Sequence, residues 1–202
     1  MKDLSNQKKE MVADGITDAE CVRRVQRGEA DAFEILVRRH EKTIFNLVYR
    51  MLGDPDEAAE VSQEVFLSAF RAAGQFRGEA NFSTWLYRIA LNHASTRRKS
   101  LATRQQKIVP LDGVETLHDP QPGPPEILEK QEIREKVQFA LNQLDPEDAA
   151  VILLRDLQDV SYDEVAEVLE IPVGTVKSRL HRARQALKSR LKTYFCAKRK
   201  AV

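Results

Sequence analysis

The stretch SYDEVAEVLEIPVGTVKSRLHRARQALK, residues 161–188, contains two short helical patterns separated by a break. Ser161 is followed by Glu164 at the spacing of a capping box, in which each side chain bonds the other residue's free backbone N–H. Pro172 suits the first turn of a helix but not the interior of one, because it has no N–H to donate. The stretch therefore predicts a helix, a short turn and a second helix.

The second predicted helix has an apolar face and a polar face, because its apolar residues recur at spacings of three and four. The apolar residues are Val176, Leu180, Ala183, Leu187 and Leu191, and we expect them to be buried. The opposite face carries Gly174, Thr175, Ser178, His181 and Arg182, with Lys177 and Arg179 beside them.

The polar face has the chemistry of a reader of the DNA major groove. Small residues at its start allow close approach, Ser178 can donate or accept at a base edge, and Arg182 can bind guanine through two hydrogen bonds. A helix-turn-helix places its second helix in this way. The alternative is a core hairpin with a solvated basic face, since many such hairpins share the break.

Charge is strongly segregated along the chain, although the formal net charge is only +1. Residues 80–111 and 171–202 carry 6 and 10 basic groups and no acidic ones, whereas residues 112–170 carry 16 acidic and 4 basic groups. Two acid-free basic blocks favour contact with a polyanion at two places. Solvated basic faces are the other interpretation.

Composition excludes several classes of protein. No apolar run approaches the roughly 20 residues of a membrane helix, and the N-terminus has no apolar signal segment, so we expect a cytoplasmic protein without membrane contact. Cys21 and Cys196 form neither a disulfide framework nor a metal motif, and the four histidines are scattered. We therefore expect no metal and no cofactor, and no catalytic group of residues is recognisable.

Helix signals recur along the chain and β-type alternation is absent, so we expect an all-α fold. The first predicted helix follows a capping box at Thr17 and Glu20 and ends at Gly28, and the second ends near Gly53. The third runs from Pro55 to Gly74 and the fourth starts at about Thr84. The fifth starts after Pro125, and the sixth runs from Pro146 to Leu157. Proline and glycine collect in DPQPGPP, which cannot propagate a helix. We expect two small helical domains joined by a flexible linker.

Taken together, these patterns resemble those of a bacterial sigma factor of the extracytoplasmic-function group. The likeness covers about residues 17–192 and rests on GEADAFEILVRRH, EVSQEVFLSAFRA, FRGEANFSTWLYRIALNHA, the proline-rich linker and the stretch quoted first. It implies a flexible N-terminus at 1–16, a promoter-melting and polymerase-binding domain (region 2) at 17–99, a linker at 100–125, a minus-thirty-five-reading domain (region 4) at 126–195 and a basic tail at 196–202.

The resemblance also implies roles for residues of the first domain. Glu60, Gln63, Glu64, Phe66 and Leu67 would meet the polymerase clamp, while Val61, Val65 and Phe70 are expected in the core. Ala72, Phe76 and Asn92 would capture a base extruded from the minus-ten element, and Arg88, Arg97, Arg98 and Lys99 would hold phosphates of the opened strand. The alternative for Phe76 and for Trp85 is packing against neighbouring helices.

For the minus-thirty-five element the resemblance implies base contacts by Lys177, Ser178, His181 and Arg182, the face already identified from periodicity; Thr175 and Arg179 flank them. The chain departs from the family's usual pattern in three places. Ala59 and Glu60 stand where an acidic pair is common, Glu170 stands where many relatives have a turn glycine, and His181 occupies a variable position.

The partners implied by the resemblance are RNA polymerase core enzyme, promoter DNA and an anti-sigma factor. Two other functions remain open. A sigma mimic that only sequesters an anti-sigma factor would tend to lose the basic residues present here. A dimeric helix-turn-helix repressor would leave the segment FSTWLYRIALN without a purpose.

Overall fold

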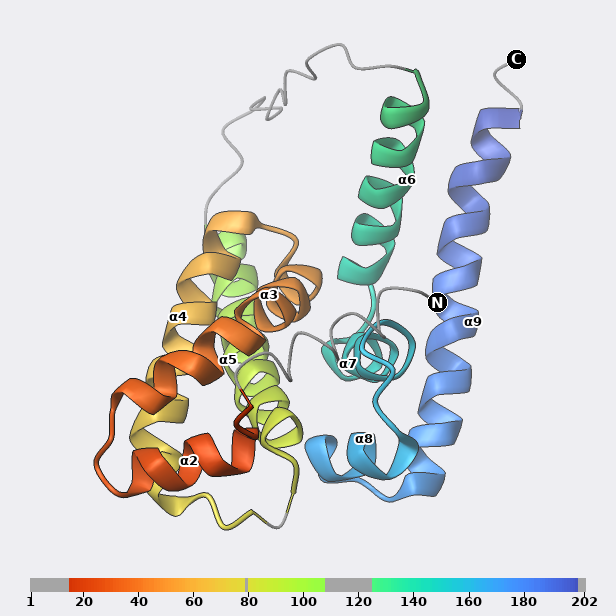
Figure 1. Ribbon diagram of the computed structural model, residues 1–202. Coiled ribbons are helices and arrows are strands. Elements are labelled where there is room, and N and C mark those ends of the chain that lie inside the picture. Colours follow the sequence, from red (N-terminus) through yellow and green to blue (C-terminus); the bar gives the residue numbers. More distant parts are fainter. Residues whose placement is uncertain (1–14, 79, 108–124, 200–202) are drawn as a thin grey trace.

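The computed structural model describes residues 15–78, 80–107 and 125–199, and these residues form helices and no strands (Figure 1). The helices fall into two groups that follow one another along the chain. The all-α fold with two helical domains is therefore confirmed. Most of the expected N-terminal segment and of the expected linker, and the end of the expected tail, lie outside the described residues.

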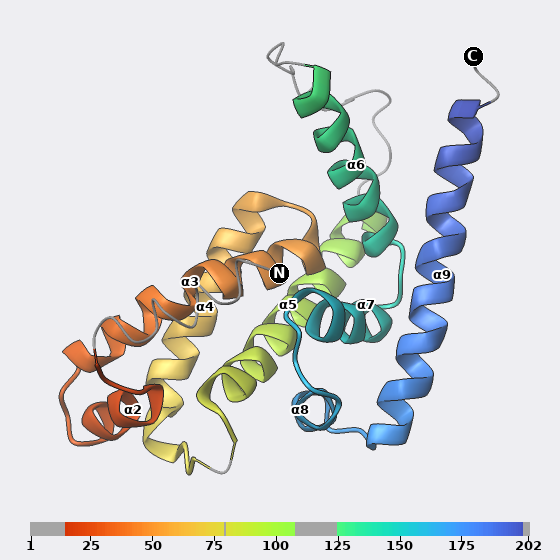
Figure 2. The same ribbon diagram turned by 45° about the vertical axis from the view of Figure 1, so that its right-hand side comes forward.

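Among the described residues, the first domain contains four α-helices and a short 3-10 turn. Its elements are α2 (Asp18–Gln26), α3 (Asp31–Leu52), α4 (Pro55–Ala72), the 3-10 turn (Ala73–Gln75) and α5 (Phe82–Lys107). Fully buried apolar residues from α3, α4 and α5, among them Leu36, Val61 and Leu86, form its core. The long helices α3, α4 and α5 pack against one another, and α3 crosses α4 in both views (Figures 1 and 2).

Local signals set most helix ends in this domain. Asp54 caps α4 with its side chain, and Gly53 ends α3 at φ 81°, where a left-handed residue is needed. The capping box at Thr17 is only half formed. Thr17 accepts the N–H of Glu20, but the Glu20 carboxylate binds Arg23 and Arg27 instead of reaching back.

The second domain contains α6 (Pro125–Asn142), α7 (Pro146–Ile152), a π-helical turn (Leu153–Leu157), α8 (Tyr162–Leu169) and α9 (Val173–Arg199). Val165, Val176, Leu180 and Ala183 are buried between α8 and α9, as periodicity predicted. Leu187 and Leu191, further along α9, are only half-buried. The helix, turn and helix predicted for residues 161–188 are thus confirmed.

Three features differ from the expectation. The helix α5 begins at Phe82 and continues to Lys107, because residues 100–107 contain neither proline nor glycine. The helix α9 continues through Cys196 to Arg199, so it includes part of the expected tail. Phe70, expected in the core, is 42% exposed and only one side of its ring is covered, by Phe33.

The two domains pack against each other through α3 with α6 and α7, and through α5 with α8. In Figure 2, α7 and α8 lie beside α5, while α6 and α9 extend away from the first domain. Residues of α5 predicted to bind DNA therefore lie at or near the boundary between the domains.

Candidate functional site

The first turns of α9 present most of the residues predicted to read the minus-thirty-five element. Lys177, Ser178, His181 and Arg182 are exposed on one face, opposite the buried Val176 and Leu180. In the described part of the chain, the side chains of His181 and Arg182 form no hydrogen bond or ion pair. They are available to an external acceptor.

The other residues of this face are partly engaged within the domain. Ser178 Oγ donates to the carbonyl of Thr175 at 3.1 Å, so its lone pairs remain free to accept. Arg179 pairs with Glu147 of α7 at 2.6 Å and its side chain is only 19% exposed. Arg179 thus joins α9 to α7 in this structure.

A cluster around Tyr162 holds α8 against its neighbours, and sequence reasoning did not find it. The guanidinium of Arg155 lies 5.1 Å from the centroid of the Tyr162 ring, and the ammonium of Lys177 lies 5.7 Å from it. Both cations face the ring's negative quadrupole. The contact therefore links one residue of the predicted DNA-reading face to the start of α8.

The turn before α9 is tight and contains a strained residue. Ser161 and Glu164 form the predicted capping box at the start of α8. At its end Glu170 adopts φ 54° and ψ 41°, the left-handed conformation that glycine adopts most easily. Glu170 thus adopts the tight-turn conformation without being glycine, and its exposed carboxylate can contact residues outside the turn.

The residues predicted for base capture lie around the loop between α4 and α5. Phe76 packs against Trp85 and Phe82, with ring centroids 5.2 and 6.0 Å away. Gln26 holds the loop by donating to the carbonyls of Ala73 and Phe76 at 3.0 and 2.9 Å. Phe76 is therefore part of an aromatic cluster and also lines a surface hollow of about 180 Å³.

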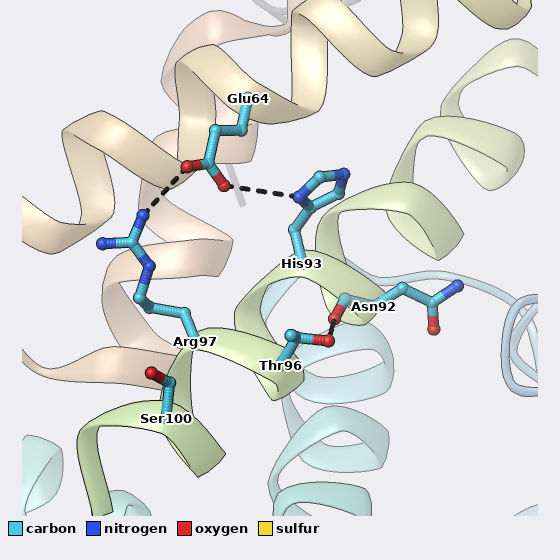
Figure 3. Close-up of a pocket in the computed structure, with 6 residues that line it drawn as sticks. All are labelled: Glu64, Asn92, His93, Thr96, Arg97 and Ser100. Atoms are coloured by element: carbon cyan, nitrogen blue, oxygen red, sulfur yellow. Dashed lines mark hydrogen bonds and ion pairs between the residues drawn. The ribbon is translucent and has the colours of Figure 1, made fainter. Parts of the chain in front are cut away.

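Asn92 is exposed on α5 and lines a second, larger hollow of about 400 Å³ (Figure 3). The amide group of Asn92 points away from Glu64 and Arg97 in this view. Ala72, the third residue predicted for base capture, is half-buried at the end of α4. The structure thus gives Asn92 a free amide, whereas Phe76 and Ala72 are partly covered.

The four cations predicted to hold the opened strand have different surroundings. Lys99 is exposed. Arg97 binds three carboxylates of α4, those of Glu57, Glu60 and Glu64, at 2.6, 3.0 and 2.9 Å. The hydrogen bond to Glu60 contributes most to raising the pKa of Arg97 above its ordinary value. Arg97 therefore joins α5 to α4.

Arg88 and Arg98 both reach the second domain. Arg88 Nη1 lies 3.1 Å from a carboxylate oxygen of Glu170. Arg98 Nη2 donates to the carbonyls of Asn142 and Leu144 at 2.5 and 2.7 Å. Burial lowers the pKa of Arg98. Both guanidinium groups are therefore bound to the second domain in this arrangement, although the side chain of Arg88 remains 41% exposed.

The residues predicted to meet polymerase lie along α4. Glu60, Gln63, Glu64 and Leu67 are exposed, whereas Phe66 is half-buried against the core. Glu60 and Glu64 carry the ion pairs with Arg97. Leu67 is 54% exposed and Phe70, three residues on, is 42% exposed, so the two form an apolar strip that the prediction only half identified.

A buried ionic cluster supports the start of the first domain. Asp18 binds Arg39 at 2.8 Å and His40 at 2.7 Å, and all three side chains are largely covered. Burial alone would raise the pKa of Asp18, but the hydrogen bonds from His40 and Arg39 outweigh it and hold this pKa below its ordinary value. The cluster ties α2 to the middle of α3.

The described residues contain neither a metal-binding cluster nor a membrane-spanning helix. Those residues contain no group of three or more histidine, cysteine, aspartate or glutamate side chains that could hold a metal ion. Each helix in the described ranges is too short or too polar to cross a membrane.

Comparisons with known proteins agree with this arrangement. Residues 36–104 match the family model "Sigma-70 region 2", and residues 134–187 match "Sigma-70, region 4". The RNA polymerase sigma-H factor of Pseudomonas aeruginosa is 39% identical over 182 residues, which cover 84% of this chain and 91% of that protein. The ECF RNA polymerase sigma-E factor of Escherichia coli is 36% identical over 191 residues, covering 89% and 97%.

Two solved structures share the fold. CnrH in complex with the cytosolic domain of CnrY has a TM-score of 0.63 and 24% identity, covering 86% of this chain and 96% of that one. The sigma factor RpoE in complex with the anti-sigma factor NepR from Bartonella quintana has a TM-score of 0.60 and 23% identity, covering 79% and 96%.

Proposed function

The chain belongs to the extracytoplasmic-function group of the sigma-70 family, and from this premise we propose how its two domains divide promoter recognition. As a sigma factor it binds RNA polymerase core enzyme and directs promoter-specific transcription initiation. Sigma factors are not enzymes. The proposal concerns the residues: α9 reads the minus-thirty-five element, α5 and the loop before it stabilise the melted minus-ten segment, and α4 binds polymerase.

The proposed role of α9 follows from its unpaired polar face. Arg182 binds a guanine edge through two hydrogen bonds, His181 and Ser178 contact neighbouring bases, and Lys177 neutralises a phosphate. Thr175 and Arg179 flank the contact, and Arg179 positions α9 through Glu147. The observation that carries this proposal is the exposure of four adjacent polar residues directly opposite a buried stripe.

In the proposed melting mechanism an unpaired base leaves the duplex and is held by the first domain. Phe76 offers a stacking surface, Asn92 reads the base edge and Ala72 leaves room beside them. Lys99, Arg88, Arg97 and Arg98 hold the phosphates of the opened strand. Lys99 is exposed in this structure, while the three arginines must first exchange their protein partners for phosphate.

Polymerase contact is assigned to the outer face of α4. Glu60, Gln63 and Glu64 supply polar contacts, and Leu67 supplies an apolar one that is open to solvent here. Phe66 is half-buried, so it contacts polymerase with only the exposed part of its ring. Phe70 extends the apolar strip, and an exposed strip of this kind is typical of a protein contact surface.

We also propose control by an anti-sigma factor and action in the cytoplasm, where polymerase is found. The fold is shared with a sigma factor solved in complex with the anti-sigma factor NepR, which supports a partner of this class. No cofactor or metal enters the proposed mechanism.

The deciding experiment is transcription in vitro with core polymerase and a library of genomic fragments. We expect transcripts whose start sites share two upstream motifs, and their absence would sink the proposal. Co-purification with core polymerase separates it from a sigma mimic. Footprinting on duplex DNA without polymerase separates it from a helix-turn-helix repressor, which would protect a palindrome unaided.

A further inference from the structure

A single side-chain amide holds both ends of the 3-10 turn that leads to Phe76. Gln26, the last residue of α2, donates through Nε2 to the carbonyl of Ala73 at 3.0 Å and to that of Phe76 at 2.9 Å. An amide nitrogen of this kind has two hydrogens, so both are used on these two carbonyls. The N–H of Phe76 closes the same turn by donating to the carbonyl of Ala73 at 3.2 Å. Gln26 therefore fixes the backbone on both sides of the turn.

The helix α2 is itself anchored on α3, so Gln26 is held at a defined place. Asp18, at the start of α2, binds Arg39 at 2.8 Å, and Arg39 also donates to the carbonyl of Ile16 at 2.7 Å. Cys21, in the middle of α2, is fully buried in the core of the domain. In both views α2 lies beside the turn that follows α4 (Figures 1 and 2). The helix thus carries a fixed amide to the backbone of the loop.

The ring of Phe76 is supported from another direction, by α5. Trp85 lies 5.2 Å and Phe82 6.0 Å from the Phe76 ring, measured between centroids. Phe82 is only 5% exposed, and its other neighbour is the ring of His40 in α3, at 5.4 Å. Phe76 is therefore held through its backbone by α2 and through its ring by α5.

From these contacts we infer that Gln26 is a positioning residue for base capture. It orders the loop so that the ring of Phe76 already has its final place when a base leaves the duplex. A loop ordered in advance loses less conformational entropy when the base stacks on it. The inference rests on the proposed role of Phe76, and it assigns to Gln26 an action through the loop and not on the DNA.

Gln26 lies at a position where loop order and overall stability can be separated. It is exposed at the end of α2, whereas the core of the domain is made by residues such as Leu36, Val61 and Leu86. A hydrogen bond at the surface makes only a small net contribution to the free energy of unfolding. Loss of the Gln26 amide should therefore loosen the loop and leave the fold intact.

The first test removes the two donors without adding charge. Gln26→Met keeps the length of the side chain and lacks the amide. In holoenzyme on a promoter with 2-aminopurine in the minus-ten segment, it should lower the equilibrium constant for opening about threefold to tenfold, the value of one net hydrogen bond. Gln143→Met, a change of another exposed glutamine in the second domain, should leave opening unaltered. Normal opening with Gln26→Met would overturn the inference.

The second test asks whether Gln26 acts through Phe76. The change Gln26→Met is repeated in a Phe76→Ala background, which completes a double-mutant cycle. We expect no further loss of opening there, because the ring that the loop positions is absent. Equal losses in the two backgrounds would mean that Gln26 contributes independently of Phe76, against the inference.

The third test restores the donors with different chemistry. The ammonium group of Gln26→Lys has three hydrogens and can donate to both carbonyls. It should recover most of the opening that Gln26→Met loses, and it should give no gain in the Phe76→Ala background. An equal gain in both backgrounds would assign the recovery to attraction of phosphate, and no recovery would show that donation to the loop is not what Gln26 supplies. Either result would contradict the inference.

The same measurements separate the inference from the proposed function. If Phe76→Ala alone opens the promoter as well as the parent does, the proposed role of Phe76 falls and the inference falls with it. If Phe76→Ala impairs opening and Gln26→Met does not, only the inference is lost. Circular dichroism of the free variants verifies that each is folded, and Gln26→Met should unfold at nearly the same urea concentration as the parent.

Discussion

The guanidinium of Arg179 lies 2.6 Å from a carboxylate oxygen of Glu147, so an ion pair joins α9 to α7 at the edge of the face proposed to meet DNA. The arginine is well covered and the glutamate is 72% exposed. A carboxylate beside a DNA-binding face repels phosphate, and it neutralises the cation it holds. The ion pair therefore holds Arg179 in position, and it also weakens the attraction between Arg179 and the DNA phosphates.

The first prediction concerns the salt dependence of promoter binding. Glu147→Gln should free the charge of Arg179 and steepen the slope of log affinity against log salt by about 1, since one more phosphate is neutralised. The free energy of unfolding should fall by no more than about 1 kcal/mol, because one end of the pair is exposed. The measurement is binding of holoenzyme to one promoter at several salt concentrations. An unchanged slope would show that Arg179 does not reach phosphate.

The second prediction separates base reading from charge. Arg182→Ala should cost about 1–3 kcal/mol at promoters with the preferred base and relax selectivity at that one position. Lys192→Ala, another exposed cation on α9, should weaken binding modestly and equally for all sequences. Affinities for a set of single-base promoter variants test this. Equal losses on every variant with Arg182→Ala would contradict the base-reading role.

The helix starts and stops of this chain could be predicted because their signals are local. Ser161 with Glu164, Asp54 before Pro55 and the left-handed Gly53 each act within one turn, and the structure has all three. The exposed face of α9 follows from periodicity for the same reason. The helix α5 continues to Lys107, past residue 100 where the linker was expected to begin, because no proline or glycine interrupts residues 100–107.

Pairings between distant segments left no local signal. Arg97 binds three carboxylates that lie 33 to 40 residues earlier in the chain. Arg98 donates to backbone carbonyls that lie 44 and 46 residues later. From sequence alone both belong to a basic cluster, and nothing distinguishes them from the exposed Lys99. Phe70 was assigned to the core by its spacing, but it lies at the edge of the apolar stripe of α4 and is partly exposed.

The third prediction concerns strand melting. Phe76→Ala should reduce the stability of the open complex by about 1–3 kcal/mol, the value of stacking one base on an aromatic ring. Phe45→Ala is the control, because Phe45 is also half-buried and stacks on a neighbouring ring, that of Tyr49, in α3. Fluorescence of 2-aminopurine in the minus-ten segment reports opening. A similar loss for both variants would assign Phe76 to packing alone.

The fourth prediction concerns polymerase affinity. Leu67→Ala should raise the dissociation constant for core enzyme at least several-fold, since truncating a well-placed interface side chain commonly costs more than about 1 kcal/mol. Leu157→Ala in the second domain is matched in chemistry and exposure, at 53% against 54%, and should have a smaller effect. Fluorescence anisotropy with labelled sigma factor measures both. If Leu157→Ala weakened binding more, α4 would not be the main contact.

The fifth prediction follows from the Asp18 cluster and depends on pH. The pKa of Asp18 in the folded protein is below its ordinary value of 3.8, so the unfolded chain binds the proton more tightly than the folded one. The stabilisation of the folded protein by Asp18 is therefore fully present above about pH 4 and is lost as the pH falls through the folded pKa.

At pH 7, Asp18→Asn should lower the free energy of unfolding by about 1–3 kcal/mol, because His40 and Arg39 lose a buried charged acceptor. Urea titrations at several pH values should show the difference between the two proteins shrinking below pH 4, while Glu41→Gln, an exposed change on α3, stays within about 0.5 kcal/mol throughout. A difference that did not vary with pH would mean that Asp18 stabilises α2 by packing and not by its charge.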